Sequence, residues 1–147
     1  MQRAVRFLGY RSRSEAEVRS YLVRRDYSNA IAEKTLQKLR ALNYVDDESF
    51  ARNWASGRAE NLGFGPRRIE QELQNKGISQ TLIRAVVREN FGQGDESAKA
   101  KALLEKKFGN QQLNDPKVLR RAVSLLQRRG YSSKVIFDLL KQPLEDD

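Results

Sequence analysis

Apolar residues recur along the chain at the three-to-four-residue spacing of amphipathic helices, and polar residues or glycines separate one stretch from the next. No stretch alternates apolar and polar residues with the period of two that marks a half-buried strand. The pattern therefore predicts an all-α protein. After a helix end at 4–8, we expect helices over about 15–25, 29–42, 46–60, 66–76, 80–90, 95–108, 116–129 and 133–141.

Near the middle of the chain, both ends of one helix can be recognised. Gly65 precedes Pro66, and proline suits the first helical position because its missing N–H would be unpaired there anyway. At the other end, Gly77 suits the left-handed residue that closes a helix. Ile78 then packs back on Leu73, which is the hydrophobic contact of a Schellman ending. The order of these residues predicts a complete helix between two turns.

Three segments share this helix ending and the residues that follow it. Each has a leucine near the helix end, a residue that turns the chain, a residue that packs back on the leucine, and a serine that caps the next helix. Asp26 departs most from the pattern, because Asp adopts the left-handed conformation less readily than Gly. The three copies are Leu22, Asp26, Tyr27 and Ser28; Leu73, Gly77, Ile78 and Ser79; and Leu126, Gly130, Tyr131 and Ser132.

A repeated helix-turn-helix joint predicts that the chain is divided into stacked units. A short unit cannot bury its apolar face alone, so we expect an elongated, curved array of three tandem three-helix repeats. A leading helix and the first repeat are expected at 1–61 and the second repeat at 62–109. The third repeat, at 110–147, ends before a third helix of its own and carries an acidic tail.

One helix face can be predicted in more detail. In the helix at 29–42, the apolar face expected to point inward consists of Ile31, Thr35, Leu36, Leu39 and Leu42. Asn43 is the expected left-handed residue at its end.

The charge of the chain favours an anionic partner. Lys and Arg number 28 against 19 Asp and Glu, which gives a net charge of +9, and this suits nucleic acid or an acidic protein groove. The absence of cysteine excludes disulfides and thiolate chemistry. No apolar run approaches the 18 residues or so of a membrane span, and arginines interrupt the start too often for a signal peptide. We therefore expect a cytoplasmic protein.

Pairs of basic residues recur at corresponding ends of the repeat helices. Such periodic charge could follow a phosphate backbone or an acidic filament groove, whereas the alternative for any single pair is an ordinary solvated helix face. Phe64, in a loop, is a candidate contact able to stack on bases, and Trp54 is expected in the core. The basic candidates are Arg24, Arg25, Arg58, Arg67, Arg68, Lys76, Lys106, Lys107, Arg120, Arg121, Arg128 and Arg129.

Catalytic chemistry has little support in this sequence. Without His and Cys, the commonest bases, nucleophiles and transition-metal ligands are missing. The run 46–48 could bind a hard cation, but a capped helix start that matches the helix dipole is the favoured interpretation. Glu70 and Glu72 lie two apart on a helix and do not face each other, so they form no acid–base pair. We expect no enzyme activity, no cofactor and no metal.

Four blocks of residues, taken in order, resemble the RecX family of recombinase regulators. The resemblance covers roughly 3–140, and its departures are few: Val18 and Val45 stand where leucine is commoner. The blocks are Arg13-Ser14-Glu15 with Glu17-Val18 and Leu22; Tyr44-Val45-Asp46-Asp47 with Phe50-Ala51 and Arg58; Gly63-Phe64-Gly65-Pro66 with Arg68-Ile69, Glu72-Leu73 and Lys76-Gly77-Ile78; and Leu126 with Arg129-Gly130-Tyr131.

The resemblance implies an all-α protein of tandem three-helix repeats that binds in the groove of the RecA–single-stranded DNA filament, and we expect a monomer. It implies restrained filament growth, strand exchange and co-protease activity, together with lower recombinase ATPase. The alternative is a sequence-tolerant helical-repeat protein that binds DNA directly through its basic face. Single-stranded DNA is then the expected ligand, with double-stranded DNA as a further one.

Overall fold

The computed structural model describes residues 1–9, 12–109 and 111–141, and in these ranges the chain is helical throughout, with no strand. This confirms the prediction of an all-α protein. The expected tail at 142–147 lies outside the described residues. The nine helices are α1 (Gln2–Leu8), α2 (Glu15–Arg24), α3 (Asn29–Ala41), α4 (Asp47–Leu62), α5 (Pro66–Asn75), α6 (Gln80–Phe91), α7 (Asp95–Phe108), α8 (Pro116–Arg129) and α9 (Ser133–Leu140).

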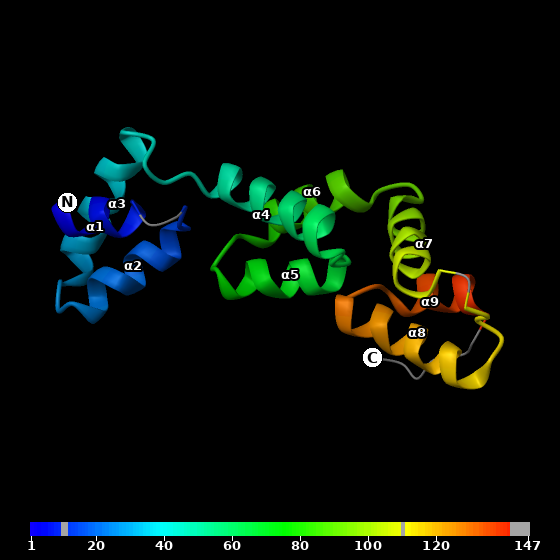
Figure 1. Cartoon of the computed structure of the whole chain (residues 1–147). Helices are drawn as coiled ribbons and strands as arrows, with labels where there is room; N and C mark the ends of the chain where they lie inside the picture. Colours follow the sequence, from blue (N-terminus) through cyan, green and yellow to red (C-terminus); the bar gives the residue numbers. More distant parts are fainter. Residues whose placement is uncertain (10–11, 110, 142–147) are drawn as a thin grey trace.

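The helices form three groups that follow one another in an elongated row, which bends at α7 (Figure 1). Each group has its own buried hydrophobic cluster: one within α1–α3, one within α4–α6 and one within α7–α9. The accessible surface is 9494 Å², whereas a compact protein of 16.9 kDa would expose roughly 7,700 Å². The excess surface is what an extended array is expected to show.

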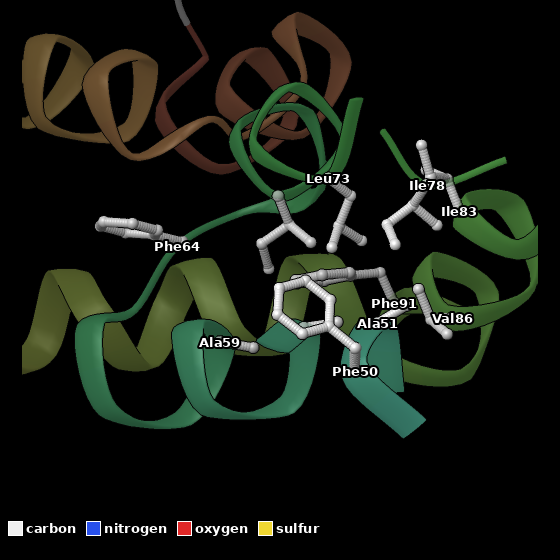
Figure 2. Packing of buried hydrophobic residues seen from close by; sticks show 11 residues of the cluster. Phe50, Ala51, Ala59, Phe64, Leu73, Ile78, Ile83, Val86 and Phe91 are labelled. Carbon is white, nitrogen blue, oxygen red and sulfur yellow. The ribbon is translucent and has the colours of Figure 1, made fainter. Parts of the chain in front are cut away.

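The hydrophobic clusters group the helices one position out of phase with the predicted repeats. The expected division placed the helix at 46–60 at the end of the first repeat, but its buried residues Phe50, Ala51, Ala55 and Ala59 pack with α5 and α6 (Figure 2). Helix α7 packs likewise with α8 and α9. The repeated joint is the same in either division, because the joint alone does not determine which flanking helix completes a unit.

All three joints have the geometry of a Schellman ending. The N–H groups of Tyr27, Ile78 and Tyr131 donate to the carbonyls of Leu22, Leu73 and Leu126 at 3.2, 3.1 and 3.0 Å. The turning residues are left-handed, with φ of 68° at Asp26, 77° at Gly77 and 93° at Gly130. The serine hydroxyls of Ser28, Ser79 and Ser132 then cap the next helix, accepting backbone N–H bonds at 3.2 to 3.3 Å.

Two inward predictions for α3 are wrong. Ile31 is 50% exposed and Leu42 is 58% exposed. The buried stripe of α3 is Ala32, Thr35, Leu36 and Leu39. Ile31 lies one residue before this stripe, about 100° around the helix, and Leu42 follows the last helical residue. Asn43 does close the helix, with φ of 60°.

Helices α8, α5 and α2 follow one another end to end along the lower edge of the row in Figure 1. At the start of α5, the N–H of Gly65 donates to the carbonyl of Arg129 at 2.6 Å, and the N–H of Arg67 donates to the carbonyl of Gly130 at 2.9 Å. These bonds pair the unsatisfied donors of one helix with the unsatisfied acceptors of another. At the end of α5, the carbonyl of Lys76 accepts a bond of 2.6 Å from the hydroxyl of Ser14, which caps α2.

Glycines allow both of these junctions to close. A Cβ on Gly65 would lie 2.7 Å from the carbonyl carbon and oxygen of Gly130, and a Cβ on Gly130 would overlap the backbone of Arg68. A Cβ on Gly77 would overlap the Cβ of Ala16. The fold therefore requires glycine at all three positions for close approach, and at Gly77 and Gly130 also for a left-handed backbone.

Candidate functional site

Two of the basic candidates join α8 to the second unit, one through α5 and the other through α4. The Arg68 Nη1 donates to the carbonyl of Arg128 at 3.2 Å, and its guanidinium carbon lies 3.8 Å from the centre of the Phe64 ring. The Arg129 guanidinium donates to the carbonyl of Leu62 at the end of α4. Both guanidinium groups thus donate to carbonyls at helix ends, so some of their N–H groups are already used within the protein and cannot bind a partner.

Two further candidates surround the single tryptophan between α4 and α5. The Arg58 guanidinium lies 4.2 Å from the Trp54 ring centre, and the Lys76 ammonium lies 5.1 Å from it. Trp54 Nε1 donates to Glu72 at 3.1 Å, and Arg58 is 3.7 Å from the same carboxylate. Lys76 also pairs with Glu17 of α2 at 3.1 Å. This cluster links the first and second units.

Phe64 is a packing residue, in contrast to its predicted role as an open contact. Its side chain is 7% exposed and belongs to the central cluster. Figure 2 shows it at the edge of that cluster, on the segment between α4 and α5 and away from Leu73 and Phe50. The guanidinium of Arg68 lies against its ring, so a base would have to displace that side chain to reach it.

A basic groove lies between the end of α4 and the side of α7. Its volume is about 540 Å³. It brings together Lys106 and Lys107, which the sequence predicted, and Lys99, which it did not. Lys99 donates to the carbonyl of Asn90 at 2.8 Å and lies over Phe91. The groove is lined by Ala59, Glu60, Asn61, Leu62, Gly63, Phe64, Lys99, Ala102, Leu103, Lys106, Lys107 and Arg129.

Other basic candidates lie on exposed helix surfaces. Arg24 and Arg128 occupy equivalent positions in α2 and α8, and each donates to a carbonyl four residues earlier, at 3.2 and 3.4 Å. Arg121 donates to Gln111 at 3.2 Å. Arg67 and Arg120 are also exposed. These side chains remain accessible to an anionic partner, and they are spread over all three units.

A second basic hollow in the first unit was largely missed by the sequence analysis. Its volume is about 480 Å³, and it is lined by Arg3, Arg6, Phe7, Tyr21 and Arg25. Only Arg25 had been named as a basic candidate. The signal that could have found the others is the spacing of three residues between Arg3 and Arg6, which puts them on one face of a short helix.

The acidic run 46–48 serves as a helix start and as an inter-unit contact. The carboxylate of Asp46 accepts bonds from the N–H and hydroxyl of Ser49 at 3.2 and 3.0 Å, and the backbone bond lowers the pKa of Asp46. Asp47 accepts a bond of 2.9 Å from the N–H of Glu15, and burial raises the pKa of Asp47. No group of three metal-ligating side chains occurs in the part of the chain that the structure describes.

Models of one protein family match all three groups of helices. The models are described as the first, second and third three-helix domains of RecX, and they match residues 1–39, 46–87 and 95–140. These ranges follow the same division as the three hydrophobic clusters, and only Val45 and Phe91 of the clusters' buried residues lie outside them. Across residues 1–9, 12–109 and 111–141, no helix combines the length and apolar character needed to cross a bilayer.

Individual relatives agree with the family models. The chain is 34% identical to a "Regulatory protein RecX" of Mycolicibacterium vanbaalenii over 97% of this chain and 81% of that one. It is 35% identical to the protein of the same name from Mycobacterium ulcerans, over 92% and 79%. Among solved structures, the "Crystal structure of regulatory protein RecX" superposes with a TM-score of 0.78 at 26% identity, covering 95% of this chain and 70% of that one.

Proposed function

The chain belongs to the RecX family of regulatory proteins, and from this premise we propose that it binds in the groove of the RecA–single-stranded DNA filament. Bound there, it modulates the recombinase, mainly by inhibiting ATP hydrolysis, strand exchange and co-protease activity. It acts as a cytoplasmic monomer and as a regulator, with no catalytic step of its own. Proteins of this name are described as regulatory, which agrees with that role.

The observation that carries this proposal is the end-to-end row of α8, α5 and α2. At 1.5 Å per residue, the three helices together run roughly 50 Å, which is longer than a compact domain of this size would offer on one side. A long ligand with repeating contacts, such as a filament groove, suits a row of repeated units. The exposed arginines and lysines of all three units give that row a charge complementary to DNA or to an acidic groove.

Hydrolysis of ATP by RecA on single-stranded DNA tests the proposal. Addition of the protein is expected to lower the rate, and an unchanged rate at saturating protein would contradict the proposal. The variant K106E/K107E reverses two cations that line the basic groove without touching the junction residue Arg129. We expect it to lose about tenfold in inhibitory potency, as charge reversal at a complementary surface does. The control R84E/R88E makes the same charge change on α6 and should inhibit like the wild type.

Direct DNA binding without the recombinase is the second candidate function. The exposed arginines of α8 and the first unit favour it, because they have room for phosphate contacts. Binding to DNA alone should weaken steeply with salt, since each phosphate contact releases counterions. Two results would favour this candidate over filament docking. The inhibition of ATP hydrolysis would increase in step with the fraction of DNA that the protein occupies, and the protein would also inhibit an unrelated ATPase that depends on single-stranded DNA.

A further inference from the structure

We propose that the hollow between α1 and α2 is a binding site for single-stranded nucleic acid, in which arginines hold phosphates and the guanidinium plane of Arg25 stacks on a base. The proposal rests on the proposed function and deepens it, because it assigns contact with the DNA strand of the filament to the first unit. The helix junctions and the groove beside α7 are then available for contacts with the other parts of the filament.

The lining of the hollow is positively charged and therefore favours binding of an anion. Arg3, Arg6 and Arg25 line one space of about 480 Å³. Among the described residues, no carboxylate forms an ion pair with any of the three. On α2, Glu17 is engaged by Lys76 at 3.1 Å instead. Three gathered like charges repel one another, and a bound polyanion relieves that repulsion.

A ladder of stacked side chains fixes the geometry of the hollow. The rings of Phe7 and Tyr21 stack with their centres 4.1 Å apart and 12° between their planes. Arg13 covers the outer face of Phe7 at 4.0 Å, and Arg25 covers Tyr21 at 4.6 Å. Arg13 is held in turn by Glu17 at 4.0 Å. One end of the ladder is therefore anchored, whereas Arg25 at the other end is exposed to solvent.

This arrangement favours unpaired nucleotides over other anions. Bases of single strands stack on aromatic rings and on arginine guanidinium planes, and such stacking is largely independent of sequence. An acidic peptide could pair with the arginines, but its Asp and Glu side chains carry no aromatic plane beside the charge to continue the ladder. A duplex offers phosphates, but its bases are already stacked on one another. The combination of two phosphate ligands, Arg3 and Arg6, with the exposed guanidinium plane of Arg25 thus favours a single strand.

Binding of a short fluorescein-labelled oligothymidylate, followed by fluorescence anisotropy at several salt concentrations, tests the charge contacts. The variant R3Q/R6Q should raise the dissociation constant at least about tenfold, and it should reduce the slope of log K against log salt by about 1.4, from two lost contacts at 0.7 each. The control R84Q/R88Q removes the same charge from α6 and should bind like the wild type. Equal binding by R3Q/R6Q and the wild type would overturn the proposal.

The stacking contact has a separate test. The variant R25K keeps the charge but removes the guanidinium plane, so it should bind oligothymidylate as weakly as the wild type binds an abasic oligonucleotide of the same length. If the wild type binds both oligonucleotides equally, or if R25K keeps the preference for bases, the hollow is a general anion site and the proposal is wrong. Circular dichroism of each variant checks that the helices are intact.

The recombinase assay separates this proposal from the proposed function. If the wild type inhibits RecA while R3Q/R6Q still binds oligothymidylate normally, the strand site fails and the proposed function stands. If the wild type binds oligothymidylate through the hollow but leaves RecA unaffected, the strand site stands and the proposed function fails.

Discussion

Helix α5 meets a different helix at each end, and the two junctions are made from different chemical groups. Toward α8, main-chain N–H groups donate directly to main-chain carbonyls, with Gly65 lying against Gly130. Toward α2, side chains make the connection: the hydroxyl of Ser14 bonds the carbonyl of Lys76, whose ammonium pairs with Glu17. We call these the backbone junction and the side-chain junction.

The difference shows what each junction tolerates. The backbone junction depends on the absence of side chains at Gly65 and Gly130, so almost any substitution at these two glycines disrupts it. Salt should weaken its main-chain hydrogen bonds little, because they join uncharged groups. The side-chain junction also contains one close approach, of Gly77 to Ala16, but its polar contacts are a hydroxyl and an ion pair, and the strength of the ion pair varies with ionic strength. The first unit is therefore expected to be the more adjustable end of the array.

The largest expected effect is at the backbone junction. Gly130→Ala combines a left-handed backbone with overlap against Arg68, and should lower the free energy of unfolding by about 3 kcal/mol or more, from roughly 1–2 for conformation and 1–3 for overpacking. Gly94→Ala is the matched control, because Gly94 has φ of 88° with open space around it. Gly94→Ala should therefore cost only the roughly 1–2 kcal/mol for backbone conformation. Urea denaturation followed by circular dichroism measures both, and equal losses would refute the close-approach argument.

A clash at the side-chain junction should be reversible by a second substitution. Gly77→Ala would collide with the Cβ of Ala16, and adding Ala16→Gly removes that Cβ. The double variant should therefore recover about 1–2 kcal/mol of coupling free energy relative to the sum of the single variants. Gly65→Ala offers no such rescue, because its Cβ meets the backbone of a residue that is already glycine. Additive losses at Gly77 and Ala16 would contradict the proposed contact.

Loss of the bridging hydroxyl should have a smaller effect. Ser14→Ala removes the cap of α2 and also the donor to the partly buried carbonyl of Lys76. Ser79→Ala removes a cap alone. The first variant should therefore be less stable than the second by about 1 kcal/mol or slightly more, the typical net contribution of one hydrogen bond. The emission of Trp54, which contacts Lys76, should shift in Ser14→Ala and stay unchanged in Ser79→Ala.

The smallest effect concerns Tyr131 in the backbone junction. Its hydroxyl donates to the carbonyl of Gly63 at 3.0 Å, and burial raises the pKa of Tyr131 to about 12. The folded pKa exceeds the unfolded value of 10.0. The neutral hydroxyl of Tyr131 therefore contributes fully to the free energy of unfolding below pH 10, and this contribution is lost as the pH rises toward 12. Tyr131→Phe should cost about 1 kcal/mol at neutral pH. The difference from the wild type should then shrink above pH 10, and a constant difference would exclude the assigned hydrogen bond.

Local signals made the helices and joints predictable. The Leu73, Gly77, Ile78 and Ser79 pattern fixes an ending, a turn and a cap within seven residues, so no distant information is needed. The site was harder to predict. The N–H of Gly65 bonds the main-chain carbonyl of Arg129, which is 64 residues away and leaves no side-chain signature in the sequence. For the same reason, Arg68 and Arg129 resembled free ligands although their guanidinium groups bond the carbonyls of Arg128 and Leu62.

The turn residue of the joints differs between helix ends that meet another helix and the described helix end at Asp26. Gly77 and Gly130 are each covered by another helix end, whereas Asp26 takes the same left-handed conformation with φ of 68° at the outer end of α2, where its side chain is exposed. Conformation alone thus permits a side chain at this position, and only a docked neighbour forbids one. Glycine at this position leaves room for a docked helix, whereas the side chain of an aspartate occupies that room. Docking of a further helix on this end of α2 would therefore first require Asp26→Gly.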